Sequence, residues 1–151
     1  MEECVDVKHA REDADVDIVQ SACAISTTCP VIVVGDDTDL LVLLIQHFDV
    51  SKHKDISMQT SSKLINVSAL KQSLDDSLSS SLLFIHALTV CDTTSRPHGI
   101  GKVSALAKHA NLKEFAKLFM LQNKSSREIE QAGEQALGVL YGCVSGSTLD
   151  F

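Results

Sequence analysis

Residues 31–39 read Val31-Ile-Val-Val-Gly-Asp-Asp-Thr-Asp39, and this stretch decides the expected fold class. Four β-branched residues in a row are typical of a short strand that is buried on both faces, and Gly35 ends the run. Apolar residues over 12–27 recur at a spacing close to helical, and residues 40–48 form a second, strongly apolar helix pattern. The order helix, strand, helix predicts a parallel α/β layer in which 31–34 is the central strand.

The remainder of the chain predicts a mainly helical second half. Residues 55–58 and 63–67 have the composition of two short strands or a hairpin, because Ser and Thr residues between them signal a turn. Beyond Ser68 the pattern becomes helical. The expected helices run to about residue 76, through 82–88, and near 102–109, 112–121 and 125–142.

The composition predicts one intracellular domain. The chain has 151 residues, of which 44% are hydrophobic, and we expect the folded domain at 12–142 between tails at 1–11 and 143–151. Five cysteines form no Cys-x-x-Cys pair, which favours a reducing compartment. There is no signal-peptide pattern and no apolar run of the ~18 residues that span a membrane. These features predict a nuclear or cytoplasmic protein that does not bind a membrane.

The net charge limits how the chain could bind nucleic acid. At −7 the protein as a whole repels a phosphate backbone. Any contact with DNA or RNA must therefore be local, through a metal ion or through a small group of suitably placed residues.

Two acidic clusters stand at expected helix starts. Asp36, Asp37 and Asp39 follow the strand at 31–34, and ligands bind outside the carboxyl ends of strands in open α/β sheets. Such a cluster is stabilised by a hard cation with oxygen ligands, or it serves as an N-cap whose charges favour the helix dipole. The second cluster is Asp13, Asp15 and Asp17 at the start of the first helix, and its alternative interpretation is acids that stabilise the amino terminus of a helix.

Two further features lie after the apolar helix at 82–90. Asp92 stands at the carboxyl end of that helix, where the dipole disfavours an anion, so neither a cap nor the dipole explains it well. Gly99-Ile100-Gly101-Lys102 then precedes a helix, and two glycines there can expose backbone N–H groups to a phosphate. A tight turn is the alternative interpretation, and the spacing does not match a Walker A motif.

Taken in order, these motifs resemble the flap-endonuclease branch of the PIN-like nucleases. The acid-Ala-acid motif opening a helix is matched by Asp13-Ala-Asp15, and the acid-x-acid motif after a strand by Asp37-Thr-Asp39. The single Asp at a helix end is matched by Asp92, and seven residues later the Gly-Ile-Gly turn is matched by 99–101. The stretch 86–95 also resembles a variant found in metazoan mobile-element-related proteins, which usually has Gly before Cys-Asp, at the position of Val90 in this chain.

The resemblance implies a PIN-like, Rossmann-like α/β fold: a short parallel sheet with helices on both faces, followed by a helix-two-turn-helix segment at about 92–121. It implies a nuclease in which Asp13, Asp15, Asp37, Asp39 and Asp92 hold one or two Mg²⁺ or Mn²⁺ ions. The turn Gly99, Ile100, Gly101 and Lys102 would contact the backbone of DNA or RNA.

The resemblance also implies parts that precede this chain in family members, namely a first strand with further carboxylates. Their absence predicts a sheet opened at 31–34 and a partner that supplies the missing segment. A catalytically inactive PIN-like module that binds nucleic acid or protein is therefore the alternative function. An aspartyl-phosphate receiver or phosphatase built on Asp36 or Asp37 is a third interpretation, but no matching Lys or hydroxyl is clearly placed.

Overall fold

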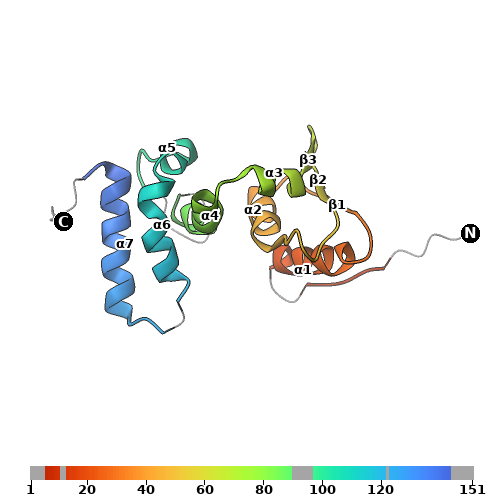
Figure 1. Ribbon diagram of the computed structural model, residues 1–151, viewed down its shortest axis with the longest axis horizontal. Helices are drawn as coiled ribbons and strands as arrows, with labels where there is room; N and C mark the ends of the chain where they lie inside the picture. Colours follow the sequence, from red (N-terminus) through yellow and green to blue (C-terminus); the bar gives the residue numbers. More distant parts are fainter. Residues whose placement is uncertain (1–5, 11–12, 90–96, 122, 144–151) are drawn as a thin grey trace, which may run out of the picture. The chain divides into compact units, whose positions relative to one another are not determined.

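A computed structural model describes residues 6–10, 13–89, 97–121 and 123–143. These residues form a mixed α/β structure with a three-stranded sheet and seven helices (Figure 1). The chain divides into two compact units, Met1–Lys71 and Gln72–Phe151, where the sequence predicts one domain over 12–142. None of the described helices is both long enough and apolar enough to cross a membrane.

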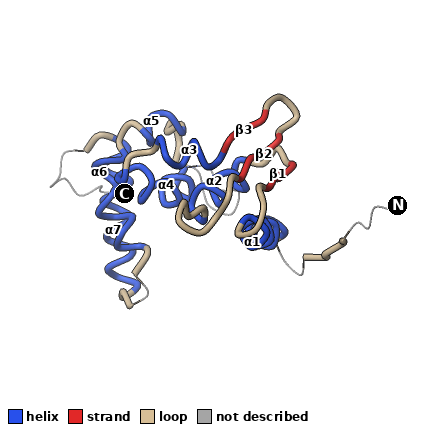
Figure 2. Tube along the Cα trace, turned by 45° about the vertical axis from the view of Figure 1, so that its right-hand side comes forward, coloured by secondary structure: helices blue, strands red, loops and turns tan. Residues whose placement is uncertain are grey.

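The first unit contains the sheet. Its elements are α1 (Ala14–Ser26), β1 (Val31–Val34), α2 (Thr38–His47), β2 (Ile56–Gln59), β3 (Leu64–Asn66) and most of α3 (Val67–Ser73). The strand order is β1-β2-β3 (Figure 2). β1 and β2 are parallel, with Val31 opposite Ile56, whereas β2 and β3 are antiparallel, with Ser57 opposite Asn66. All three predicted strands are thus present, but the sheet is mixed rather than parallel.

One face of the sheet carries the core of this unit. Val33, Ile56 and Met58 are buried there, together with Leu40 and Leu44 of α2. Alternate residues of a strand point to the same face, so these buried side chains define the side on which the helices pack. The buried Ser68 hydroxyl accepts a hydrogen bond from the Ile56 N–H at 2.9 Å, which satisfies a backbone donor inside the core.

The prediction that β1 is a central strand buried on both faces is wrong for the described structure. β1 lies at the edge of the sheet, and Ile32 and Val34 are 64% and 78% exposed. The prediction of helices on both faces of the sheet is also wrong for the described residues. The helices cover only one face, and the face that carries Ile32 and Val34 is exposed.

The second unit is helical. It consists of α4 (Asp76–Thr89), α5 (Lys102–Leu106), α6 (His109–Phe119) and α7 (Ser126–Tyr141), close to the predicted ranges. α6 and α7 lie side by side (Figures 1 and 2), and their buried residues Leu112, Ala116, Ala136 and Leu140 form a core with Phe84 of α4. On each of these two helices the buried residues are four positions apart. They therefore lie on one side of the helix and form the single buried stripe that this packing requires.

The ends of α7 are well defined. Ser125 and Glu128 form a capping box, in which each side chain accepts a hydrogen bond from the backbone N–H of the other residue. At the other end Gly142 adopts φ +83°, the left-handed conformation that glycine accommodates without a Cβ clash. The Lys108 Nζ donates to the carbonyls of Val139 at 3.1 Å and Leu140 at 2.6 Å. This ammonium group binds two carbonyls in the last turn of α7, where a positive charge is favoured by the helix dipole.

We expect Lys108→Met to lower the free energy of unfolding of the second unit by about 1–3 kcal/mol, because it removes two charge-assisted hydrogen bonds. Urea unfolding followed by circular dichroism measures the change. Lys117→Met is the matched control, since Lys117 is exposed and pairs only with Glu114 on its own helix. Equal stability of both variants would contradict a structural role for Lys108.

Candidate functional site

The first acidic motif forms the start of α1. Asp13 is the N-cap, and its carboxylate accepts a hydrogen bond from the Asp15 N–H at 3.1 Å. Asp15 and Asp17 lie in the first turn, where the helix dipole favours negative charge. Asp17 also forms an ion pair of 2.7 Å with Lys8. The expected acids at the amino terminus of this helix are therefore confirmed, with Asp13 as the cap rather than in the first turn.

The second motif repeats the same local structure at the start of α2. Asp37 is the N-cap, and its carboxylate accepts from the Asp39 N–H at 2.9 Å. In both acid-x-acid motifs the first acid thus caps the helix and the second acid occupies the first turn. This recurrence has a simple cause, since Asp is among the best N-cap residues and its short side chain reaches the N–H two residues on.

Asp36 has a different role from Asp37. Its carboxylate accepts hydrogen bonds from the Ser61 N–H at 2.8 Å and from the Ser61 hydroxyl at 2.9 Å. These bonds join the turn between β1 and α2 to the turn between β2 and β3. Asp36 therefore holds the loop that carries Asp37 and Asp39, and the alternative in which Asp36 caps α2 is wrong.

The two acidic helix starts lie close together. Burial raises the pKa of the Asp15 carboxyl, and the negative charges of Asp13, Asp37 and Asp39 raise it further. At the other end of the same pair of helices, the Cys23 Sγ lies 4.0 Å from the His47 carbonyl oxygen. α1 and α2 therefore run parallel, and this arrangement brings the four carboxylates of the two motifs to one end of the helix pair.

The charge at this end exceeds what two helix termini neutralise. Each N-terminus supplies roughly half a positive charge, against four carboxylates. Carboxylate oxygens are also the ligands that Mg²⁺ and Mn²⁺ prefer, so the donor set fits such an ion in kind and in charge. Within the described ranges, however, no three acidic, His or Cys side chains are arranged to hold a metal ion. Asp92, the fifth predicted ligand, lies outside the described residues.

The Gly-Ile-Gly turn lies in the second unit. The Ile100 N–H donates to the Pro97 carbonyl at 3.4 Å, and Gly99 adopts φ +74°, as the third residue of a type II turn requires. Ile100 is 8% exposed and packs in the helical core. Gly101 is the N-cap of α5, and Lys102 is the first residue of that helix. An added Cβ at Gly99 or Gly101 would meet nothing within 4 Å, so the backbone of the turn is open beside both glycines.

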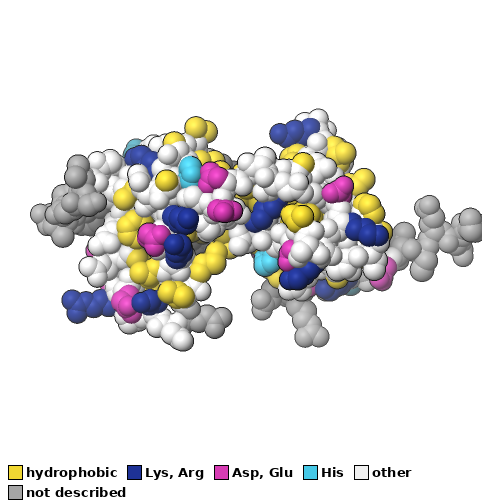
Figure 3. Space-filling model, viewed as in Figure 1, with side chains coloured by type: hydrophobic (Ala, Val, Ile, Leu, Met, Phe, Trp, Pro, Cys, Tyr) yellow, Lys and Arg dark blue, Asp and Glu magenta, His cyan; other side chains and the backbone are white. Residues whose placement is uncertain are grey.

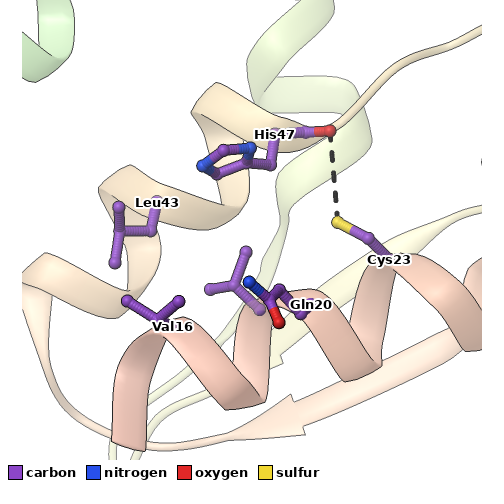
Figure 4. Close-up of a pocket in the computed structure, with 6 residues that line it drawn as sticks. Val16, Gln20, Cys23, Leu43 and His47 are labelled. Atoms are coloured by element: carbon purple, nitrogen blue, oxygen red, sulfur yellow. Dashed lines mark hydrogen bonds between the residues drawn. The ribbon is translucent and has the colours of Figure 1, made fainter. Parts of the chain in front are cut away.

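A pocket that the sequence did not indicate lies between α1 and α2. It has a volume of about 260 Å³ and is lined by Val16, Val19, Gln20, Cys23, Leu43 and His47 (Figure 4). Burial raises the pKa of the Cys23 thiol, which keeps it protonated at neutral pH and disfavours a role as a nucleophile. Val19 and Cys23 belong to the apolar positions that predict this helix, and only the packing of α2 shows that both residues line a cavity.

Comparison of the chain with protein-family models, with curated proteins and with solved structures finds no match.

We expect Asp37→Ala to lower the free energy of unfolding by about 1 kcal/mol, because Ala cannot accept the Asp39 N–H. Asp37→Asn should change it by only a few tenths of a kcal/mol, because Asn caps helices as well as Asp does. Thermal and urea unfolding would measure both. Equal loss in both variants would mean that the charge of Asp37, rather than its cap, stabilises α2.

We expect the pKa of Asp15, measured from its carboxyl chemical shift by NMR, to lie above the ordinary 3.8. The Asp37→Asn, Asp39→Asn double variant should lower this pKa without restoring 3.8, because burial of Asp15 remains. Since the folded pKa is raised, the contribution of Asp15 to stability is most favourable below pH 3.8 and falls as the pH rises through the folded pKa. An unchanged pKa in the double variant would show that the two helix starts do not share an electrostatic field.

Proposed function

We propose that this chain carries the metal-binding carboxylates of a nuclease that hydrolyses phosphodiester bonds in DNA with Mg²⁺ or Mn²⁺. The observation that carries the proposal is the packing of α1 beside α2, which brings together two acidic motifs that are 22 or more residues apart in the chain. Burial raises the pKa of Asp15, and the nearby charges of Asp13, Asp37 and Asp39 raise it further. Like charges brought together in this way are stabilised by a cation, and helix capping alone requires only one acid at each helix.

The proposal divides the acids by role. Asp15 and Asp39 are ligands, because their carboxylates stand in the first turns while Asp13 and Asp37 use a carboxylate oxygen to cap the helices. Asp13 and Asp37 fix the positions of the first turns and add ligand oxygens, and Asp92 completes the set. When bound, the metal ion activates water and offsets the negative charge of the scissile phosphate.

Nucleic-acid binding in this proposal is local. A chain of net charge −7 does not attract DNA through its overall field, so contact depends on bound metal and on exposed backbone N–H groups. The open backbone beside Gly99 and Gly101 supports such a contact, and the buried Ile100 side chain holds the turn in place. Backbone contacts do not distinguish bases, so RNA is the alternative substrate.

A catalytically inactive module that binds nucleic acid or protein is the second candidate. The arrangement of the described acidic side chains favours it, because no three of them are placed to hold a metal ion and two of them serve as caps. This candidate keeps the fold and the Gly-Ile-Gly turn and requires no metal.

Isothermal titration calorimetry with Mg²⁺ and Mn²⁺ tests the proposal. We expect wild-type protein to bind at least one ion. The Asp37→Asn, Asp39→Asn double variant should weaken binding by more than about tenfold, because the motif at the start of α2 then loses both of its negative charges. Mn²⁺-dependent cleavage of single-stranded and flap DNA should follow metal binding and should stop when a chelator removes the ion.

The matched control is Glu130→Gln, Glu134→Gln. This variant also removes two negative charges, but from exposed positions on α7. If both double variants weakened metal binding equally, the effect would come from the change in net charge and not from loss of a specific site. A folded wild-type chain that binds neither ion would eliminate the nuclease and leave the inactive module as the function.

A further inference from the structure

One hydrogen bond joins the Gly-Ile-Gly turn to the end of α7. The hydroxyl of Tyr141, the last residue of α7, donates to the His98 carbonyl at 3.0 Å, although the two residues are 43 positions apart in the chain. On the inner side of the turn, Ile100 belongs to the same buried core as Leu140 of α7. The end of α7 therefore holds the turn on two sides, through the core and through the Tyr141 hydroxyl.

The part of α7 that carries Tyr141 is itself fixed. The Lys108 Nζ binds the carbonyls of Val139 and Leu140, the two residues before Tyr141. Gly142, the residue after it, ends the helix in the left-handed conformation. The backbone is thus held on both sides of Tyr141, and its side chain reaches His98 from a defined position.

The carbonyl that Tyr141 binds belongs to the central peptide of the turn. Pro97 to Ile100 form a type II turn, in which the peptide between His98 and Gly99 is the middle one. A type I turn differs chiefly by a rotation of this peptide, because ψ of the second residue is about −30° in type I and about +120° in type II. Glycine at position 99 accepts both forms, so the sequence does not fix the orientation of the peptide. The bond from Tyr141 favours the type II form.

The same peptide carries the Gly99 N–H. In a planar trans peptide the C=O and N–H groups point in opposite directions, so this N–H points away from the Tyr141 hydroxyl. Among the described residues nothing accepts a hydrogen bond from it. Gly99 is exposed, and an added Cβ there would meet nothing within 4 Å. In the described structure this N–H is therefore open to an acceptor from another molecule.

We propose that Tyr141 is a positioning residue for nucleic-acid binding, because its hydroxyl keeps the turn in the form that presents the Gly99 N–H to a phosphate oxygen. This inference rests on the proposed function, in which the turn contacts the backbone of DNA or RNA. In the type I form the His98 carbonyl would take the place of the Gly99 N–H. A carbonyl oxygen and a phosphate oxygen are both acceptors, so that form would repel the ligand.

The charges of the second unit make the orientation of this N–H important. On the face drawn in Figure 3, Lys and Arg side chains, in dark blue, are interspersed with Asp and Glu side chains, in magenta, over the helices of this unit. They do not form one basic patch on that face. Attraction of a phosphate to the turn therefore depends on correctly oriented backbone donors.

We expect Tyr141→Phe to weaken the binding of single-stranded DNA by about two- to tenfold. The apparent affinity falls in proportion to the fraction of molecules whose turn keeps the competent form. A single neutral hydrogen bond from the half-exposed Tyr141 changes that fraction only modestly. The substitution keeps the aromatic ring and removes only the hydroxyl.

NMR spectroscopy of the full chain, combined with fluorescence anisotropy of a labelled oligodeoxythymidine, tests the proposal. In a type II turn the His98 Hα lies close to the Gly99 amide hydrogen, whereas in a type I turn the amide hydrogens of His98 and Gly99 lie close together. The nuclear Overhauser effects between these pairs therefore report the form of the turn. The first should dominate in wild-type protein, and Tyr141→Phe should strengthen the second and weaken oligonucleotide binding.

Ser125→Ala is the matched control. It removes the N-cap at the other end of α7, so it destabilises the same helix without touching the turn. It should change neither the Overhauser effects nor the affinity. Unchanged Overhauser effects in Tyr141→Phe overturn the proposal, as does a turn that changes form with no loss of affinity. If wild-type protein bound no oligonucleotide while Tyr141→Phe still changed the turn, the proposed contact with nucleic acid would fail, but Tyr141 would stand as the residue that sets the form of the turn.

Discussion

The parallel packing of α1 on α2 is the constraint on which the candidate site depends. Each helix begins with an acidic motif, and two parallel neighbours necessarily place both starts at the same end. The buried residues Val19 and Ala22 of α1 and Leu40 and Leu44 of α2 keep the helices against the sheet. Burial raises the pKa of Asp15, and the resulting repulsion from Asp13, Asp37 and Asp39 raises it further. Hydrophobic burial, which is worth far more than an exposed charge pair, sets this geometry, and the charges must accommodate it.

Capping and metal binding compete for the same carboxylates only in part. An N-cap uses one oxygen of its carboxylate, and in Asp13 and Asp37 that oxygen accepts a hydrogen bond from a backbone N–H. The second acid of each motif is not the cap residue, so the acid-x-acid pattern provides a fixed turn and an additional carboxylate at once. This division of roles explains why a local helix signal and a candidate metal centre occur in the same three residues.

The edge of β1 illustrates a limit of local patterns. Four β-branched residues indicate a strand that suits an apolar environment, but the pattern contains no information on which side a neighbour lies. In the described structure β2 covers one edge and the helices cover one face. Ile32 and Val34 therefore remain exposed, although their residue types match those of the buried Val33.

The sequence by itself determined the elements and the helix starts. The pattern of residue types located the three described strands and six of the seven described helices to within a few residues, whereas α4 begins six residues before the expected start at 82. The acidic motif after β1 predicted a cap at Asp36 or Asp37, and Asp37 forms it. These features depend on neighbours along the chain, so local pattern suffices. Only the tertiary structure decided that β1 is an edge strand, that β3 is antiparallel, and that Asp36 bonds to Ser61. The approach of Asp15 to Asp37 and Asp39 was also decided by the tertiary structure. All four features depend on packing between segments that are far apart in the sequence, so local pattern cannot predict them.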